Sequence, residues 1–163
     1  MEWCICFIGP DMRKLVALLL LVGCRKSDDR SFADMQERGR QVMGVDQYAS
    51  AHVFEDLPDG GRIVLDTKDP SDTAGIAAIR RHMRDIEAAF RAGDFTKPFQ
   101  VHAMTVPGTA AMSQWHDVIE YEAIDRPRGG EVRIHTTQPA AIAAIHQFLA
   151  FQRDAHHAAS HDP

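Results

Sequence analysis

Apolar and polar residues alternate along two pairs of short segments in this chain. The first pair covers residues 52–57 and 62–67, which flank Pro-Asp-Gly-Gly, and the second covers 118–124 and 131–136, which flank Arg-Pro-Arg-Gly-Gly at 126–130. Alternation with a period of two is typical of strands that bury one face, and glycine-rich connections of this length are typical of hairpins. The pattern predicts two β-hairpins.

Each hairpin is followed by a segment with the spacing of an amphipathic helix. The first helix should end at Gly93, which can adopt the left-handed conformation common at helix ends. Pro70 and Pro139 are each expected in the first turn of a helix, where a missing N–H costs nothing. The apolar stripe of the first helix consists of Ile76, Ile79, Met83, Ile86 and Phe90. That of the second consists of Ile142, Ile145 and Leu149.

The two hairpin–helix segments are copies of each other. Residues 60–70 align with 129–139 at a spacing of 69, and residues 76–79 align with 142–145 at a spacing of 66, so the first copy has three extra residues. We interpret this as a duplicated strand–hairpin–strand–helix unit. Two such units can bury their apolar faces together. The predicted fold is α+β, a four-stranded antiparallel sheet with two helices on one face.

The segment before the repeat has the pattern of an export signal. Arg13 and Lys14 precede an unbroken apolar run at 15–22, which ends in Gly23 and Cys24. The run is far shorter than the ~20 residues of a membrane-spanning helix, and it fits a secretory signal. Its end resembles the lipobox of bacterial lipoproteins, whose cysteine is acylated. We expect cleavage before Cys24 and lipidation of Cys24.

These features divide the chain into three parts. Residues 1–23 are the predicted signal peptide, with Met12 as the expected true start, because the first eleven residues fit a signal poorly. Residues 24–44 are a tether and a short helix from Ser31 to about Met43. Residues 45–163 are the duplicated domain with a histidine-rich C-terminal tail. Between the copies, 94–116 is expected to be a loop-rich connector with a short helix from Thr109.

Charge and cysteine content agree with an exported protein. The formal net charge is −5, which argues against nucleic acid or an anionic membrane surface as the main partner. All three cysteines, Cys4, Cys6 and Cys24, lie in or at the end of the signal, so the mature chain has no intrachain disulfide. The expected partner is a lipid bilayer, held through acylated Cys24. Arg25 after the cysteine favours the periplasmic face of the outer membrane; no protein partner is predicted.

The sequence contains no common catalytic motif. It lacks Gly-x-Ser-x-Gly, a Walker loop, Gly-x-Gly-x-x-Gly, Cys-x-x-Cys and His-Glu-x-x-His. Glu120 and Glu122 share one strand face, which is ordinary for a solvent-exposed sheet. No catalytic residue is predicted.

Nine histidines, all after Cys24, are the main candidates for chemistry, since imidazole binds copper and zinc. His156 and Gln152 take the stripe positions that Phe90 and Ile86 hold in the first copy. Buried polar groups need partners, so this departure from the repeat points to a site. The candidate metal ligands are His52, His82, His102, His146 and His156.

The repeat limits which of these histidines can meet. It places His82 and His146 on opposite flanks of equivalent helices, so a site joining His156 to His52 or His102 is expected instead. The alternative interpretation is that all five are hydrogen-bonded residues at the edge of the core, with no metal.

Short motifs spread over residues 40–160 provide a further comparison. They include Met43-Gly44-Val45-Asp46-Gln47, His52-Val53-Phe54, Ile79-Arg80-Arg81-His82, Val101-His102-Ala103 and Ala144-Ile145-His146-Gln147-Phe148. With these motifs the chain resembles a family of small exported bacterial proteins of unassigned function. Members are often labelled aspartate carbamoyltransferase, but that enzyme needs two α/β domains and a Ser-Thr-Arg-Thr phosphate loop, which this chain lacks.

The functional hypothesis is therefore a membrane-anchored extracytoplasmic lipoprotein with a non-catalytic binding domain, which binds copper or zinc through histidines. The alternative is a structural or protein-interaction module of the cell envelope without metal. A third interpretation is an enzyme on an unfamiliar scaffold.

Overall fold

The structure is a computed structural model that describes residues 30–46 and 48–161. The predicted signal, its cleavage site and Cys24 lie outside these ranges. Residues 30–43 are helical, in agreement with the predicted short helix. Among the helices of the described ranges, none is both long enough and apolar enough to cross a bilayer.

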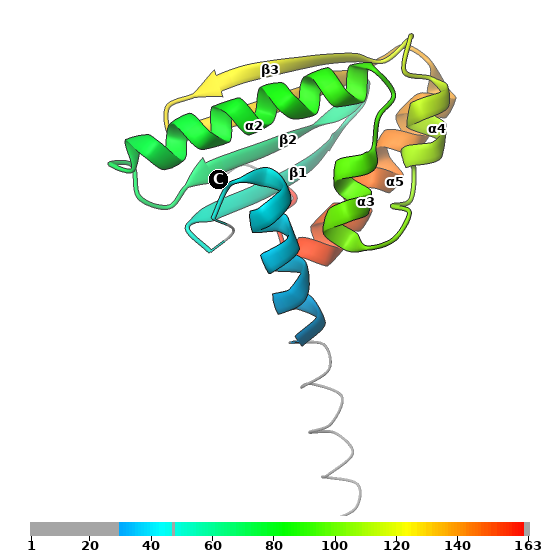
Figure 1. Ribbon diagram of the computed structural model, residues 1–163. Coiled ribbons are helices and arrows are strands. Elements are labelled where there is room, and N and C mark those ends of the chain that lie inside the picture. The colour runs from blue at the N-terminus through cyan, green and yellow to red at the C-terminus, as the bar shows by residue number, and fades with distance from the viewer. Residues whose placement is uncertain (1–29, 47, 162–163) are drawn as a thin grey trace, which may run out of the picture. The chain divides into compact units, whose positions relative to one another are not determined.

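Four strands form one antiparallel sheet (Figure 1). They are β1 (Ser50–Leu57), β2 (Gly60–Thr67), β3 (Glu120–Arg126) and β4 (Gly129–His135). Their order across the sheet is β1-β2-β4-β3, so each hairpin stays together and β2 meets β4 in the middle. The two predicted hairpins and the antiparallel sheet are confirmed.

The contact between β2 and β4 relates the two copies. Ile63 pairs with Val132, the residue 69 positions later and thus its own equivalent in the repeat. An antiparallel pair centred on equivalent residues places an approximate two-fold axis at this point. The duplication seen in the sequence is therefore expressed as two-fold pseudo-symmetry of the sheet.

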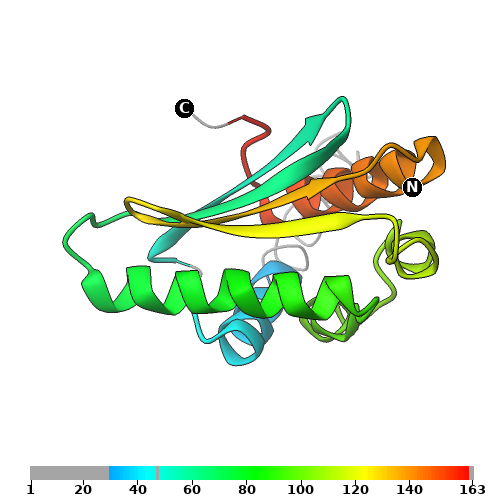
Figure 2. The same ribbon diagram turned by 90° about the horizontal axis from the view of Figure 1, so that it is seen from above.

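Both long helices, α2 (Thr73–Arg91) and α5 (Pro139–His156), cover the same face of the sheet. A Cβ at Gly61 would meet Leu149 of α5, and one at Gly130 would meet Met83 of α2. Gly130 pairs with Leu65, which is four residues from Gly61 and so points to the same side. Figure 2 shows α2 running alongside β3. The predicted arrangement of the helices is confirmed.

The start of α2 differs from the prediction. Pro70 lies before the helix, whereas Pro139 is the first residue of α5. The three extra residues of the first copy supply Asp72 as the N-cap, and its Oδ1 accepts a hydrogen bond from the Gly75 N–H at 2.8 Å. The end is as expected, since Gly93 follows α2 with a φ of 72°.

The connector between the copies is more helical than predicted. It contains α3 (Thr96–His102) as well as α4 (Thr109–Gln114). The prediction of a loop over residues 96–102 is therefore wrong. Phe99 and Val101 are two positions apart, which is not the spacing of a helical apolar stripe. In the structure only Val101 of α3 is buried.

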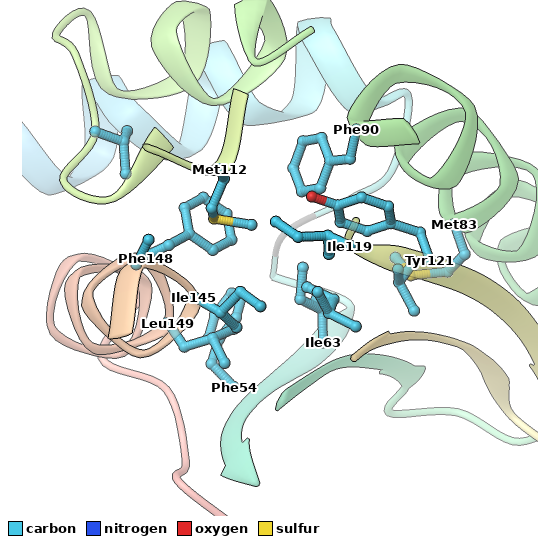
Figure 3. Close-up of a cluster of buried hydrophobic side chains, with 14 of the residues drawn as sticks. Phe54, Ile63, Met83, Phe90, Met112, Ile119, Tyr121, Ile145, Phe148 and Leu149 are labelled. Carbon is cyan, nitrogen blue, oxygen red and sulfur yellow. The ribbon is translucent and has the colours of Figure 1, made fainter. Parts of the chain in front are cut away.

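Aromatic side chains from α2, β3 and α5 meet in the core (Figure 3). Phe90 contacts Tyr121 and Phe148 edge-on, with ring centroids 5.8 Å apart in both pairs. The Tyr121 hydroxyl points toward Phe90 and has no hydrogen-bond partner in the described residues. Burial raises the pKa of Tyr121. This half of the core is thus almost wholly apolar.

The other face of the sheet is covered by ion pairs. Arg62 bridges Glu55 at 2.5 Å and Glu131 at 3.5 Å, and Arg126 contacts Asp66 at 3.3 Å. Asp66 and Glu131 are largely buried beneath their arginine partners, so the charges named on this face are paired with one another.

Candidate functional site

Four of the five candidate histidines line one cavity on the helical side of the sheet. His52 comes from β1, His82 from α2, and His102 and His156 are the last residues of α3 and α5. His82 is buried and the other three are half-buried. The remaining lining residues are Met43, Phe54, Ile63, Met83, Ile86, Phe90, Lys97, Pro98, Val101, Phe148 and Gln152.

His156 lies at the centre of the histidine cluster. Its ring centroid is 5.1 Å from that of His52 and 5.2 Å from that of His102. Phe54 stacks on His52 at 5.7 Å, and Phe151 meets His102 edge-on at 5.0 Å. The structure therefore joins His156 to both partners that the repeat favoured.

Few hydrogen bonds hold these imidazoles. His102 Nε2–H donates to Gln152 Oε1 at 3.0 Å. His156 Nδ1 is buried and has no hydrogen-bond partner in the described residues. A buried nitrogen without a hydrogen-bond partner costs about 1–3 kcal/mol of stability. The cavity therefore contains a ring nitrogen that would gain stability by binding a metal ion or another partner.

Burial keeps the imidazoles neutral. It lowers the pKa of His52 to about 4, because the charged ring would lose its hydration. The pKa of His82 falls to about 3 through burial and then the nearby charge of Lys97. Burial followed by the neighbouring histidines lowers the pKa of His156 to about 3. Burial also lowers the pKa of His102, opposed by the Gln152 hydrogen bond. Neutral imidazole is the form that binds metal ions.

The cavity is small, with a volume of about 60 Å³. A single water needs roughly 10–15 Å³, so the space suits a few waters or one ion and is too small for a nucleotide or haem. In the described ranges, no three His, Cys, Asp or Glu side chains are arranged to hold a metal ion. The ring nitrogens of the cluster do not converge on one point in this conformation.

His146 lies outside the cavity and has another role. Its Nε2–H donates to the Leu57 and Gly60 carbonyls, at 3.0 and 2.9 Å, at the turn between β1 and β2. Arg80, its equivalent in the repeat, donates to Arg126 and Gly129, the equivalent carbonyls of the other turn. His146 therefore fastens a hairpin to a helix and is excluded from the site that we propose.

Other histidines lie at the surface. His135 pairs with Glu120 on the open face at 3.2 Å, and His161 approaches Glu55 at 3.5 Å. His116 is exposed beside the Arg91 carbonyl. These residues give natural controls for binding at the cavity.

Sequence reasoning missed three lining residues, Met43, Met83 and Lys97. Met83 was assigned to the apolar stripe of α2. It does belong to that stripe, but it also lines the cavity. Lys97 lies on α3, the helix that was not predicted. His102 of the same helix was a candidate from the sequence, but the place of Lys97 at the cavity could have been found only by recognising α3.

Comparison of the chain with protein-family profiles, with curated proteins and with solved structures finds no match in any of the three. The geometry of the cavity is therefore the guide to function.

Proposed function

We propose that this protein is a non-catalytic binding domain, tethered to a bacterial membrane through acylated Cys24, that binds one copper or zinc ion in the histidine-lined cavity. The proposed ligands are His52, His102 and His156. The observation that carries the proposal is the central place of His156, whose ring centroid lies 5.1 and 5.2 Å from the other two. Imidazoles that share a tetrahedral ion, with metal–nitrogen bonds of about 2.0–2.1 Å, have ring centres roughly 5 Å apart.

Ion binding needs only local movement. The ring torsions of histidine are broad and roughly two-fold, so the nitrogens can turn toward a common point while the ring centres stay in place. His156 Nδ1, unpartnered in the described residues, then gains a bond instead of remaining orphaned.

The lining supports binding instead of catalysis. No carboxylate, hydroxyl or thiol is found among the described residues that line the cavity, so its polar groups are the four imidazoles, the Lys97 amine and the Gln152 amide. The thioethers of Met43 and Met83 line the same cavity. Soft thioether ligands favour Cu(I), whereas imidazole alone suits zinc as well.

A second candidate is a structural or protein-interaction module of the cell envelope without metal. It is favoured by the aromatic contacts of the histidines with Phe54 and Phe151, which allow these rings to serve as ordinary packing groups.

Titration of the full chain, purified in detergent, with Zn(II) and Cu(I) under a competing chelator separates the two candidates. We expect binding of one ion per chain, abolished by His156→Phe and by His52→Tyr. Both variants install the residue of the equivalent position in the other repeat, so the fold should tolerate them. His135→Ala, on the open face, is the control and should bind as the wild type does. No binding, or equal binding by all variants, would support the structural module.

The membrane tether has a separate test. In a bacterial host fed a labelled fatty acid, the wild-type chain should carry the label and sediment with membranes. Cys24→Ser should abolish both. A labelled Cys24→Ser chain, or an unlabelled wild type in the soluble fraction, would contradict the anchor without affecting the metal proposal.

A further inference from the structure

Gln152 is a buried polar residue in an otherwise apolar row of α5. It is 5% exposed, and it occupies the position that Ile86 holds in α2. The isoleucine in the equivalent helix indicates that this backbone position accepts an apolar side chain. The Oε1 atom of Gln152 accepts a hydrogen bond from His102 Nε2 at 3.0 Å.

This hydrogen bond determines where the proton of His102 resides. A carbonyl oxygen only accepts hydrogen bonds, so His102 Nε2 must carry the hydrogen. A neutral imidazole, the form that binds metal ions, has a single N–H. His102 Nδ1 is therefore left with its lone pair available.

We infer that Gln152 is a positioning residue, which fixes the tautomer and ring orientation of His102 so that His102 binds the ion through Nδ1. The inference rests on the proposed function, since it concerns a ligand of the same ion. Histidines that bind metals generally donate their other N–H to a carbonyl or carboxylate, and loss of that partner typically weakens binding about 10–100-fold.

The test uses two substitutions in the full chain with Zn(II) as the probe. Gln152→Met removes the acceptor at similar length, and we expect the Kd for Zn(II) to rise about 10–100-fold. Gln152→Glu keeps an acceptor at the same place and should bind within about threefold of the wild type or more tightly. NMR of ¹⁵N-labelled histidine should report the Nε2–H tautomer of His102 in the metal-free wild type and a mixture of tautomers in Gln152→Met.

The outcomes separate this inference from the proposed function. If the wild type binds Zn(II) and Gln152→Met binds equally well, or if His102 carries its proton on Nδ1, the positioning role is overturned alone. If the wild type binds no ion at the cavity, the proposed function fails and the inference falls with it. A merely structural role would lower the melting temperature of Gln152→Met and leave its Kd and the His102 tautomer unchanged.

Discussion

The two halves of the duplicated domain place different residues at equivalent positions. In one half, Phe90 of α2 packs on Tyr121 of β3, with ring centroids 5.8 Å apart. In the other half, the equivalent of Phe90 is His156 of α5, 66 positions later, and the equivalent of Tyr121 is His52 of β1, 69 positions earlier. The ring centroids of these two histidines lie 5.1 Å apart. One backbone geometry thus holds an apolar pair in one copy and an imidazole pair in the other.

This difference separates the requirements of the fold from those of the site. Phe90 is 2% exposed and contributes a full aromatic side chain to the core. His156 fills the same position, but its Nδ1 has no hydrogen-bond partner among residues 30–46 and 48–161, at a cost of about 1–3 kcal/mol. Because an aromatic side chain is already accommodated at the equivalent site, folding alone does not account for the histidine. Binding does.

Removal of the apolar ring should give the largest effect. Phe90→Ala is expected to reduce the free energy of unfolding by about 3–5 kcal/mol, through lost burial and the cavity left behind. His156→Ala should cost clearly less, since the half-buried imidazole contributes less packing. Denaturant unfolding measures both. Equal losses would contradict the division between a stabilising half and a binding half.

Acidification should give the second-largest effect, because it destabilises the half of the domain that contains His52 and His156. The folded-state pKa values of His52, His82 and His156, about 4, 3 and 3, lie below the value of about 6.5 in the unfolded chain. The unfolded state thus binds more protons below pH 6.5, and stability falls as the pH drops.

Between pH 6.5 and pH 5 we expect a loss on the order of 1 kcal/mol for each of the three rings in the metal-free protein. The double variant His52→Tyr/His156→Phe should show a much flatter profile by thermal denaturation. Parallel profiles for the variant and the wild type would contradict the buried neutral state of these rings.

Replacing one imidazole by its apolar equivalent should be mildly stabilising. His156→Phe removes the orphaned Nδ1, and we expect a gain of about 1 kcal/mol in the metal-free chain with complete loss of ion binding. A stability–function exchange of this kind is typical of binding sites. A clear loss of stability in His156→Phe would indicate that the imidazole is needed for packing.

The smallest effect is expected at His146, because its role is the same as that of its equivalent, Arg80, in the other half. His146 and Arg80 both donate to hairpin carbonyls, so His146→Leu should cost about 0.5–1.5 kcal/mol and leave the affinity for Zn(II) unchanged. Calorimetry of the same samples gives both quantities. A changed affinity would place His146 in the site after all.

Much of the fold could be predicted from the sequence because it follows from local patterns. The alternation around each Gly-Gly turn located the hairpins, and the constant spacing of 69 identified the duplication. The order of the strands, with β2 beside β4, came only from the structure. Exact helix starts could not be predicted, as Pro70 shows, because the Asp72 cap depends on three residues that the second copy lacks.

The site was partly predictable. The stripe positions of Gln152 and His156 identified the polar end of α5 by comparison with Ile86 and Phe90. His102 was a candidate from the sequence, but the helix α3 that carries it and Lys97 was not predictable, because a short helix with one buried residue leaves no clear period in the sequence. The exclusion of His146 from the site depended on its hydrogen bonds to a turn 86 and 89 residues away, which no local pattern contains.

The most direct test of the account is to locate the ion itself. Crystals of the protein grown with Zn(II) or Cu(I) and measured at the absorption edge of the metal should show one anomalous peak within bonding distance of His52, His102 and His156. Anomalous peaks confined to surface histidines such as His135 or His161, with the cavity unchanged, would contradict it.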